Sequence, residues 1–113
     1  MLLRAWWMLT LYLEIINQTP KPLSLLSCET NGVLVNQTFL IEPFNRNLFE
    51  SRSHVWTNQG KCYYFWFNDT NVEIMWYFNQ RTKQEYYGIV ASPDYHATVR
   101  VPESGHAQFI IIS

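Results

Sequence analysis

Short apolar segments separated by turn-forming residues run through this sequence, and this pattern constrains the fold more than any other feature. Clusters of Gly, Pro, Asn, Asp and Ser recur roughly every 8–15 residues. No segment carries an apolar stripe of helical period over three turns. A chain of 113 residues has room for one domain. The sequence therefore predicts an all-β fold, an antiparallel β-sandwich in a single domain over residues 1–113.

The expected strands are segments in which apolar and polar residues alternate or in which apolar residues cluster. Those expected outside the central hairpin are residues 8–16, 23–28, 33–41, 85–91, 96–101 and 106–112. Residues 48–56 have a mixed pattern that gives no firm assignment. Residues 42–47 are expected to form a loop and residues 57–60 a turn, because both contain turn-forming residues.

The clearest unit is a hairpin rich in aromatic residues. Lys61–Phe67 is one arm, Asn68–Asn71 is the turn and Val72–Phe78 is the other arm. Successive side chains of a strand point to opposite faces, so the run Tyr63–Phe67 places rings on both faces. The chain holds five Trp, seven Tyr and seven Phe. Some of these rings point outward, unless the strands are buried on both faces.

The N-terminal segment and the two cysteines allow two interpretations each. Residues 1–13 have the early Arg and apolar run of a signal peptide, but no small-residue cleavage site follows, and alternation favours a strand from Met8. Cys28 and Cys62 are expected to be buried free thiols in strands. A disulfide is the alternative, which requires their Cα atoms to lie within about 7 Å.

Catalytic and metal-binding patterns are missing from the sequence. His54, His96 and His106 have no metal-ligand spacing, and the acidic residues are scattered. No nucleophile elbow, phosphate-binding loop or dinucleotide fingerprint occurs. The formal net charge is −1, so the chain does not have the excess of basic residues that is typical of nucleic-acid-binding proteins. We expect a protein without enzyme activity, without a metal or cofactor and without a nucleic-acid partner.

The surplus of aromatic residues points to a binding surface. Tyr and Trp combine an apolar ring with a polar tip, which suits the membrane interface and sugar stacking. Facing rings also attract a quaternary ammonium group such as choline by cation–π interaction. The aromatic runs of the hairpin and the pair Tyr86-Tyr87 are the candidates for such a surface.

Four segments resemble the actinoporin-like family of sea-anemone cytolysin-type proteins. His96–Ile110 is similar to the last two strands of the family, including the turn Ser104-Gly105-His106-Ala107. Gly60–Trp76 is similar to the family's central aromatic hairpin, which closes in Met75-Trp76. Tyr86-Tyr87 stands where the family carries an adjacent aromatic pair, and Leu11–Thr19 resembles its first apolar strand.

This resemblance implies a β-sandwich that binds membranes containing choline-headed lipids such as sphingomyelin or phosphatidylcholine. In the toxin members it also implies secretion, oligomers on membranes and cytolytic pores. The chain departs from the family at two places. Residues 1–7 leave no room for the long N-terminal helix that builds the pore, so the expected fold lacks it. Tyr77-Phe78-Asn79 replaces a Ser-Val-Pro run of the headgroup pocket.

The leading hypothesis is therefore a secreted or membrane-associated lipid-binding protein. Its rings would come from both arms of the hairpin and the following strand: Tyr63, Tyr64, Trp66, Trp76, Tyr77, Tyr86 and Tyr87. Its contacts to lipid phosphate would come from Lys61, Arg81 and Lys83. One alternative is a glycan-binding module, since fungal fruit-body lectins share this sandwich, with Asn68, Asp69 and Asn79 beside the rings. Another is a secreted interaction domain with Cys28 and Cys62 bridged.

Overall fold

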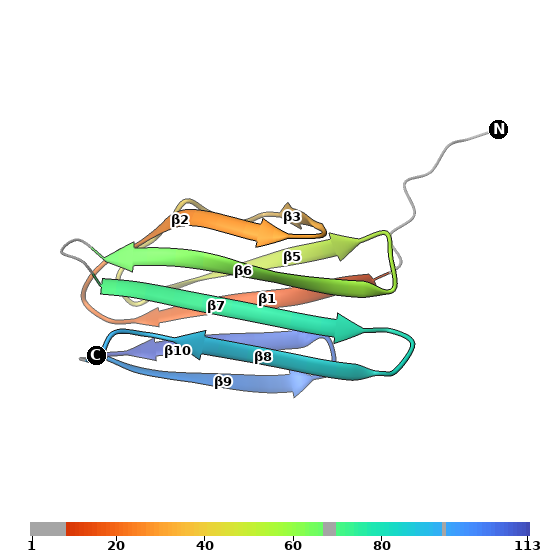
Figure 1. The fold of residues 1–113 in the computed structure, drawn as a ribbon. Coiled ribbons are helices and arrows are strands. Elements are labelled where there is room, and N and C mark those ends of the chain that lie inside the picture. Colours follow the sequence, from red (N-terminus) through yellow and green to blue (C-terminus); the bar gives the residue numbers. More distant parts are fainter. Residues whose placement is uncertain (1–8, 67–69, 94) are drawn as a thin grey trace.

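The computed structural model describes residues 9–66, 70–93 and 95–113, which form two stacked five-stranded sheets (Figure 1). Sheet A has the strand order β3-β5-β1-β10-β9, and sheet B has the order β4-β2-β6-β7-β8. The strands are β1 (Leu9–Gln18), β2 (Leu23–Thr30), β3 (Val33–Val35), β4 (Leu40–Ile41), β5 (Asn45–Ser53), β6 (Thr57–Trp66), β7 (Thr70–Asn79), β8 (Gln84–Val90), β9 (His96–Glu103) and β10 (His106–Ile112).

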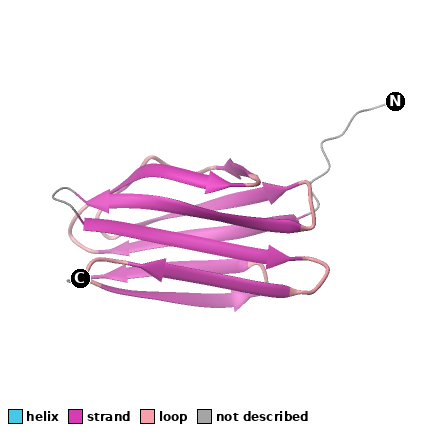
Figure 2. Ribbon diagram, in the orientation of Figure 1, coloured by secondary structure: helices cyan, strands magenta, loops and turns pink. Residues whose placement is uncertain are grey.

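The all-β class and the sandwich architecture agree with the sequence-based prediction. The described residues contain no helix (Figure 2), and therefore none that could span a membrane. Every strand pair is antiparallel except β1 with β10, which run parallel at the centre of sheet A. The expected strands near residues 8–16, 23–28, 85–91, 96–101 and 106–112 are present, as is the central hairpin.

The core lies between the sheets and is made of alternate residues of the central strands. In β1 the inward side chains include Leu11, Leu13 and Ile15, each fully buried. In β10 Ala107, Phe109 and Ile111 take the same role. The larger inward side chains of the facing layer are aromatic or branched: Tyr64, Val72, Ile74, Trp76, Phe78 and Tyr87. Of the hairpin rings, Tyr64, Trp76 and Phe78 thus pack inside.

Trp76 connects the two sheets. Its indole lies over Gly60, the residue opposite it on β6, where an added Cβ would come within 2.4 Å of the ring. Its Nε1 donates to Asn58 Oδ1 at 3.0 Å, and the same oxygen accepts from Ser51 Oγ of sheet A at 2.7 Å. Asn58 Nδ2 donates back to the Ser51 carbonyl at 2.7 Å. This network satisfies polar groups that would otherwise be costly to bury.

The network also explains a wrong sequence-based assignment. Residues 57–60 carry turn-forming residues but open strand β6, because Asn58 is needed inside the core and Gly60 is needed beneath Trp76. The turn between β5 and β6 is formed by residues 54–56 instead. Most of the unassigned segment 48–56 belongs to strand β5. This strand begins at Asn45, inside the loop expected at residues 42–47.

Cys28 and Cys62 form a disulfide between directly paired residues of β2 and β6. The expectation of free thiols is wrong, because register places their Cα atoms 4.1 Å apart. The amide of Gln37 covers the bridge. Its Nε2 lies 3.2 Å from Cys28 Sγ and donates to the buried Tyr64 hydroxyl at 3.1 Å.

The expected strand over residues 33–41 is interrupted. Residues 33–35 pair with β5 in sheet A, whereas Leu40 and Ile41 pair with β2 in sheet B. Asn36 adopts a left-handed conformation with φ of 66°, which asparagine tolerates better than most residues. The chain therefore crosses from one sheet to the other here, and Gln37 reaches the disulfide.

The turn Ser104-Gly105 holds the open sides of the two sheets together. Ser104 Oγ donates to Glu85 of β8 at 2.6 Å, and the Gly105 amide donates to the same carboxylate at 3.2 Å. Gly105 has φ of 81°, which favours glycine. Burial alone would raise the pKa of Glu85, but these hydrogen bonds outweigh it and lower the pKa.

Gly60→Ala is expected to destabilise the fold by about 1–3 kcal/mol, because its Cβ would overlap the Trp76 ring in a site that cannot widen. Chemical denaturation monitored by fluorescence measures the change. Gly88→Ala is the matched control, since its Cβ would meet the Tyr86 and Met75 side chains on the open outer face of sheet B, where they have room to move aside. Equal stability of Gly60→Ala and the parent chain would contradict this packing.

Glu85→Gln is expected to flatten the acid side of the stability profile. A carboxyl whose pKa is lowered by folding stabilises the native state above its unperturbed value of about 4.5. That contribution disappears as the pH falls through the lowered native value. Unfolding free energies at pH 7 and pH 3 should therefore differ less in the variant than in the parent chain. An unchanged difference would show that this carboxylate contributes nothing to the pH dependence.

Candidate functional site

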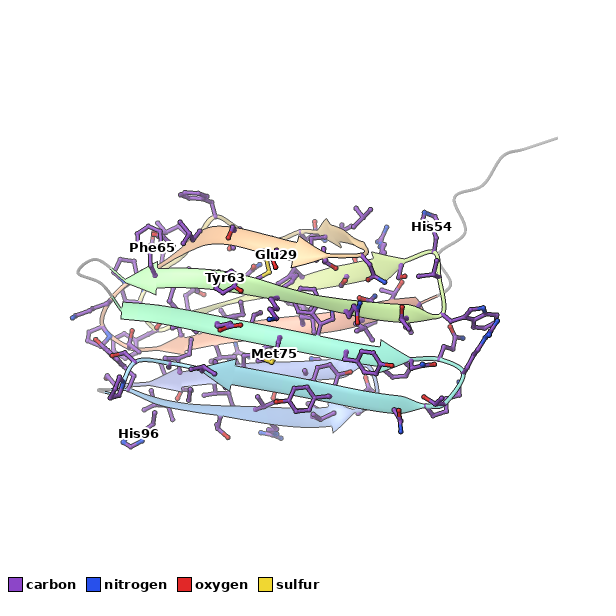
Figure 3. The ribbon with its side chains drawn as sticks, viewed as in Figure 1. Glu29, His54, Tyr63, Phe65, Met75 and His96 are labelled. Atoms are coloured by element: carbon purple, nitrogen blue, oxygen red, sulfur yellow. A yellow bond between two sulfur atoms is a disulfide. The ribbon has the colours of Figure 1, made fainter. Side chains whose placement is uncertain are left out.

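The outer face of sheet B carries the aromatic side chains that do not fit in the core. On β7 the residues Glu73, Met75 and Tyr77 point outward, because their neighbours Ile74 and Trp76 are buried. Strand β6 presents Lys61, Tyr63 and Phe65 beside them in register. Figure 3 shows Glu29, Tyr63, Phe65 and Met75 over this face. The candidate site lies on this face, toward the end where β7 leads into β8.

A shallow pocket of about 470 Å³ is hollowed into this face. The side chains that border it come from four neighbouring strands: Glu29, Gln59, Lys61, Met75, Tyr77 and Tyr86. Tyr77 and Tyr86 are directly opposite each other on β7 and β8. Tyr86 is 59% exposed, so one aromatic wall of the pocket is open to solvent.

Neighbouring residues determine how the two tyrosine side chains lie. Gly88 lacks a side chain on the same face, and a Cβ there would lie 2.8 Å from the Tyr86 hydroxyl. The Tyr86 side chain therefore lies along the strand toward Gly88 and toward Met75. The Tyr77 hydroxyl accepts a hydrogen bond from Asn79 Nδ2 at 3.2 Å. The Tyr77 ring is thus oriented by this bond before any ligand binds, which lowers the entropic cost of binding.

The charges around the pocket favour a cation. Lys61 lies opposite Glu29 on β2, and its ammonium is 3.9 Å from the Glu73 carboxylate on its other side. Two carboxylates therefore accompany one ammonium on this part of the face. The remaining negative charge and the aromatic walls create a favourable environment for a positively charged ligand group.

The sequence-predicted rings divide into three groups. Tyr63, Tyr77 and Tyr86 lie on the outer face of sheet B, with the predicted cation Lys61 among them. Three others are packed in the core and almost fully buried: Tyr64, Trp76 and Tyr87. Of these, Trp76 also borders the pocket. The side chain of Trp66 lies outside the described residues, as do the predicted glycan contacts Asn68 and Asp69.

The other two predicted cations are in the turn between β7 and β8. Arg81 and Lys83 are exposed there, and the Arg81 guanidinium carbon lies 4.5 Å from the centre of the Trp56 ring. Trp56, Glu29, Gln59 and Met75 were not among the sequence-predicted site residues. Strand register places Glu29, Gln59 and Met75 at the site. Trp56 lies next to the β7–β8 turn because β6 begins at Thr57, a start that the sequence-based assignment of residues 57–60 as a turn did not predict.

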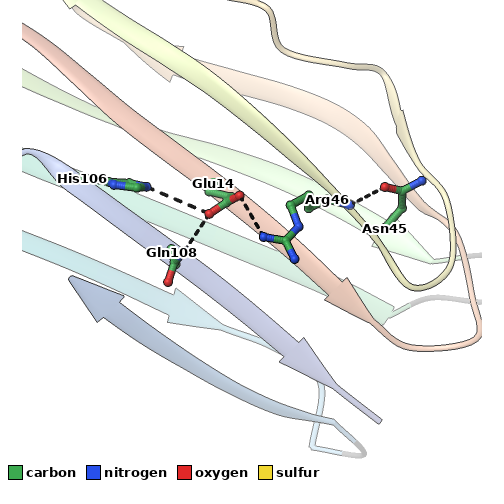
Figure 4. A network of polar contacts seen from close by, with 5 residues as sticks. All are labelled: Glu14, Asn45, Arg46, His106 and Gln108. Carbon is green, nitrogen blue, oxygen red and sulfur yellow. Dashed lines mark hydrogen bonds and ion pairs between the residues drawn. The ribbon is translucent and has the colours of Figure 1, made fainter. Parts of the chain in front are cut away.

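A second polar cluster lies on the outer face of sheet A (Figure 4). Glu14 accepts hydrogen bonds from Gln108 Nε2 at 2.8 Å and from Arg46 Nη1 at 3.4 Å, and His106 Nε2 lies 4.0 Å away. These contacts join β5, β1 and β10 across the sheet. Among the described residues no group of His, Cys, Asp and Glu could hold a metal ion. The Glu14 carboxylate is thus satisfied within the sheet, whereas the buried His106 Nε2 makes no hydrogen bond with the described residues.

Comparison with solved structures supports the fold. The lipid binding protein Nakanori matches with a TM-score of 0.71 and 11% sequence identity, over 93% of this chain and 71% of that one. At this identity the match shows a shared β-sandwich fold. No protein-family model and no curated protein sequence matches the chain.

Proposed function

We propose that this protein binds choline-headed membrane lipids, phosphatidylcholine or sphingomyelin, through the pocket on the outer face of sheet B. The main support for the proposal is the pair of half-buried Tyr77 and exposed Tyr86 at a pocket lined by Glu29 and Lys61, with the Glu73 carboxylate 3.9 Å from the Lys61 ammonium. Aromatic faces attract a quaternary ammonium ion by about 0.5–2 kcal/mol each. Such an ion cannot donate hydrogen bonds, so rings and nearby carboxylates suit it well.

The fold and the disulfide give further support. Nakanori, which shares the sandwich, is a lipid binding protein. The Cys28–Cys62 bridge suits an oxidising compartment, so we propose that the protein is secreted and meets membranes from outside. Pore formation is not needed for this recognition, and the proposal is one of lipid binding.

Replacing both Tyr77 and Tyr86 by Ala is expected to weaken sedimentation with phosphatidylcholine vesicles, with or without sphingomyelin, by at least fivefold. The reason is the loss of both aromatic faces beside the pocket. Tyr12→Ala is the matched control, because Tyr12 is a 46% exposed tyrosine on the opposite sheet. Thermal unfolding of each variant checks that the fold is retained.

Other outcomes of the same experiment have distinct meanings. Unchanged binding by the double variant would reject the pocket as the lipid site. Release of a dye trapped in the vesicles would add pore formation to the activity. No binding of the parent chain to any vesicle would reject lipid recognition. Binding on a glycan array in that case would favour a sugar ligand stacked on Tyr86 beside Gln59 and Glu29.

A further inference from the structure

We propose that Trp56, Arg81 and Lys83 form a membrane anchor that sits in the headgroup layer and places this end of the sandwich on the bilayer. The inference rests on the proposed lipid binding, and it adds the part of the molecule that faces the membrane and the lipid phosphate as its ligand. Three features of the structure support it: the geometry of two joined turns, their link to the pocket and the positive charge of their exposed side chains.

The anchor is built from two turns that are held together. The amide of Gln80 donates to the Trp56 carbonyl at 2.8 Å, which fastens the turn after β7 to the turn before β6. The Arg81 guanidinium carbon then lies 4.5 Å from the centre of the Trp56 ring. Trp56 is nevertheless 41% exposed, and its neighbour Val55 is 50% exposed. An exposed tryptophan next to a cation suits the interface between hydrocarbon and headgroups.

Asn79 connects the anchor to the pocket. Its Nδ2 donates to the Tyr77 hydroxyl at 3.2 Å, and its Oδ1 accepts from the amides of Arg81 and Thr82 at 2.9 and 3.2 Å. One side chain therefore fixes both a pocket ring and the turn that bears the cations. A lipid whose headgroup reaches Tyr77 would belong to the same bilayer that Arg81 contacts.

The charge of the anchor identifies its ligand. Neither Arg81 nor Lys83 takes part in an ion pair within residues 9–66, 70–93 and 95–113. The acid nearest to them in the chain, Glu85, is engaged by Ser104 and Gly105. Guanidinium groups bind phosphate oxygens through charged, often bidentate hydrogen bonds. The Arg81 guanidinium beside the exposed indole, with exposed Lys83 in the same turn, therefore fits a phospholipid surface.

The opposite end of the sandwich provides an internal comparison. Phe44 precedes β5 and Trp56 follows it, so the two side chains lie at opposite ends of a nine-residue strand. Phe44 is 72% exposed, more than Trp56. If exposed apolar area alone decided the orientation, Phe44 would enter the membrane. We expect Trp56 to enter the membrane instead, because the cations Arg81 and Lys83 lie at its end of the sandwich, as does the Asn79 side chain that connects this end to the pocket.

Tryptophan quenching by vesicles containing brominated phosphatidylcholine tests the anchor directly. At a vesicle concentration that sediments both proteins, the parent chain should lose fluorescence, and Trp56→Phe should remove most of that loss. Arg81→Gln with Lys83→Gln should weaken sedimentation with vesicles containing phosphatidylserine by at least threefold. Phe44→Ala, the matched control at the other end, should change neither measurement.

The outcomes separate this inference from the proposed function. Sedimentation of the parent chain with quenching unchanged by Trp56→Phe would overturn the anchor and leave lipid binding in place. Weaker binding by Phe44→Ala but not by the Arg81 and Lys83 variant would place the other end on the membrane and overturn it as well. Failure of the parent chain to bind any vesicle would overturn both. Binding that needs Arg81 and Lys83 but not the pocket tyrosines would support the anchor alone.

Discussion

The contact between Trp76 and Gly60 determines how the rest of this molecule is arranged. The indole fills the space above a glycine on the neighbouring strand and donates to Asn58, which in turn bonds Ser51 on the other sheet. The contact therefore fixes the pairing of β6 with β7 and holds the two sheets together. Because side chains alternate along a strand, fixing Trp76 inward also fixes Met75 and Tyr77 outward.

A shift of one residue in this hairpin would exchange its two faces. Both faces carry aromatic residues, so apolar pattern alone does not select one. Gly60 selects it, since only a position without a side chain can lie beneath the indole. The disulfide between Cys28 and Cys62 secures the same register on the other side of β6. The aromatic surface and the aromatic core are thus two consequences of one register.

The sequence predicts the strands well where alternation is strong, as in β1, β9 and β10, and where turn signals lie between them. It fails at residues 57–60, whose turn-forming residues serve the core, and at residue 36, where the chain changes sheets. The rings Tyr63, Tyr77 and Tyr86 could be suspected from composition. Their separation from Tyr64, Trp76 and Tyr87 depends on register, which no local pattern in the chain specifies.

Amide chemical shifts recorded during a titration with short-chain phosphocholine micelles test most directly whether the outer face of sheet B binds lipid. Lipid binding at this face should give the largest changes at residues 59–61, 75–77 and 86–88, with further changes at residues 55–56 and 80–83. It should give small changes on the outer face of sheet A, around Leu48 and Arg46. Changes concentrated on sheet A, or no changes at saturating phosphocholine, would contradict it.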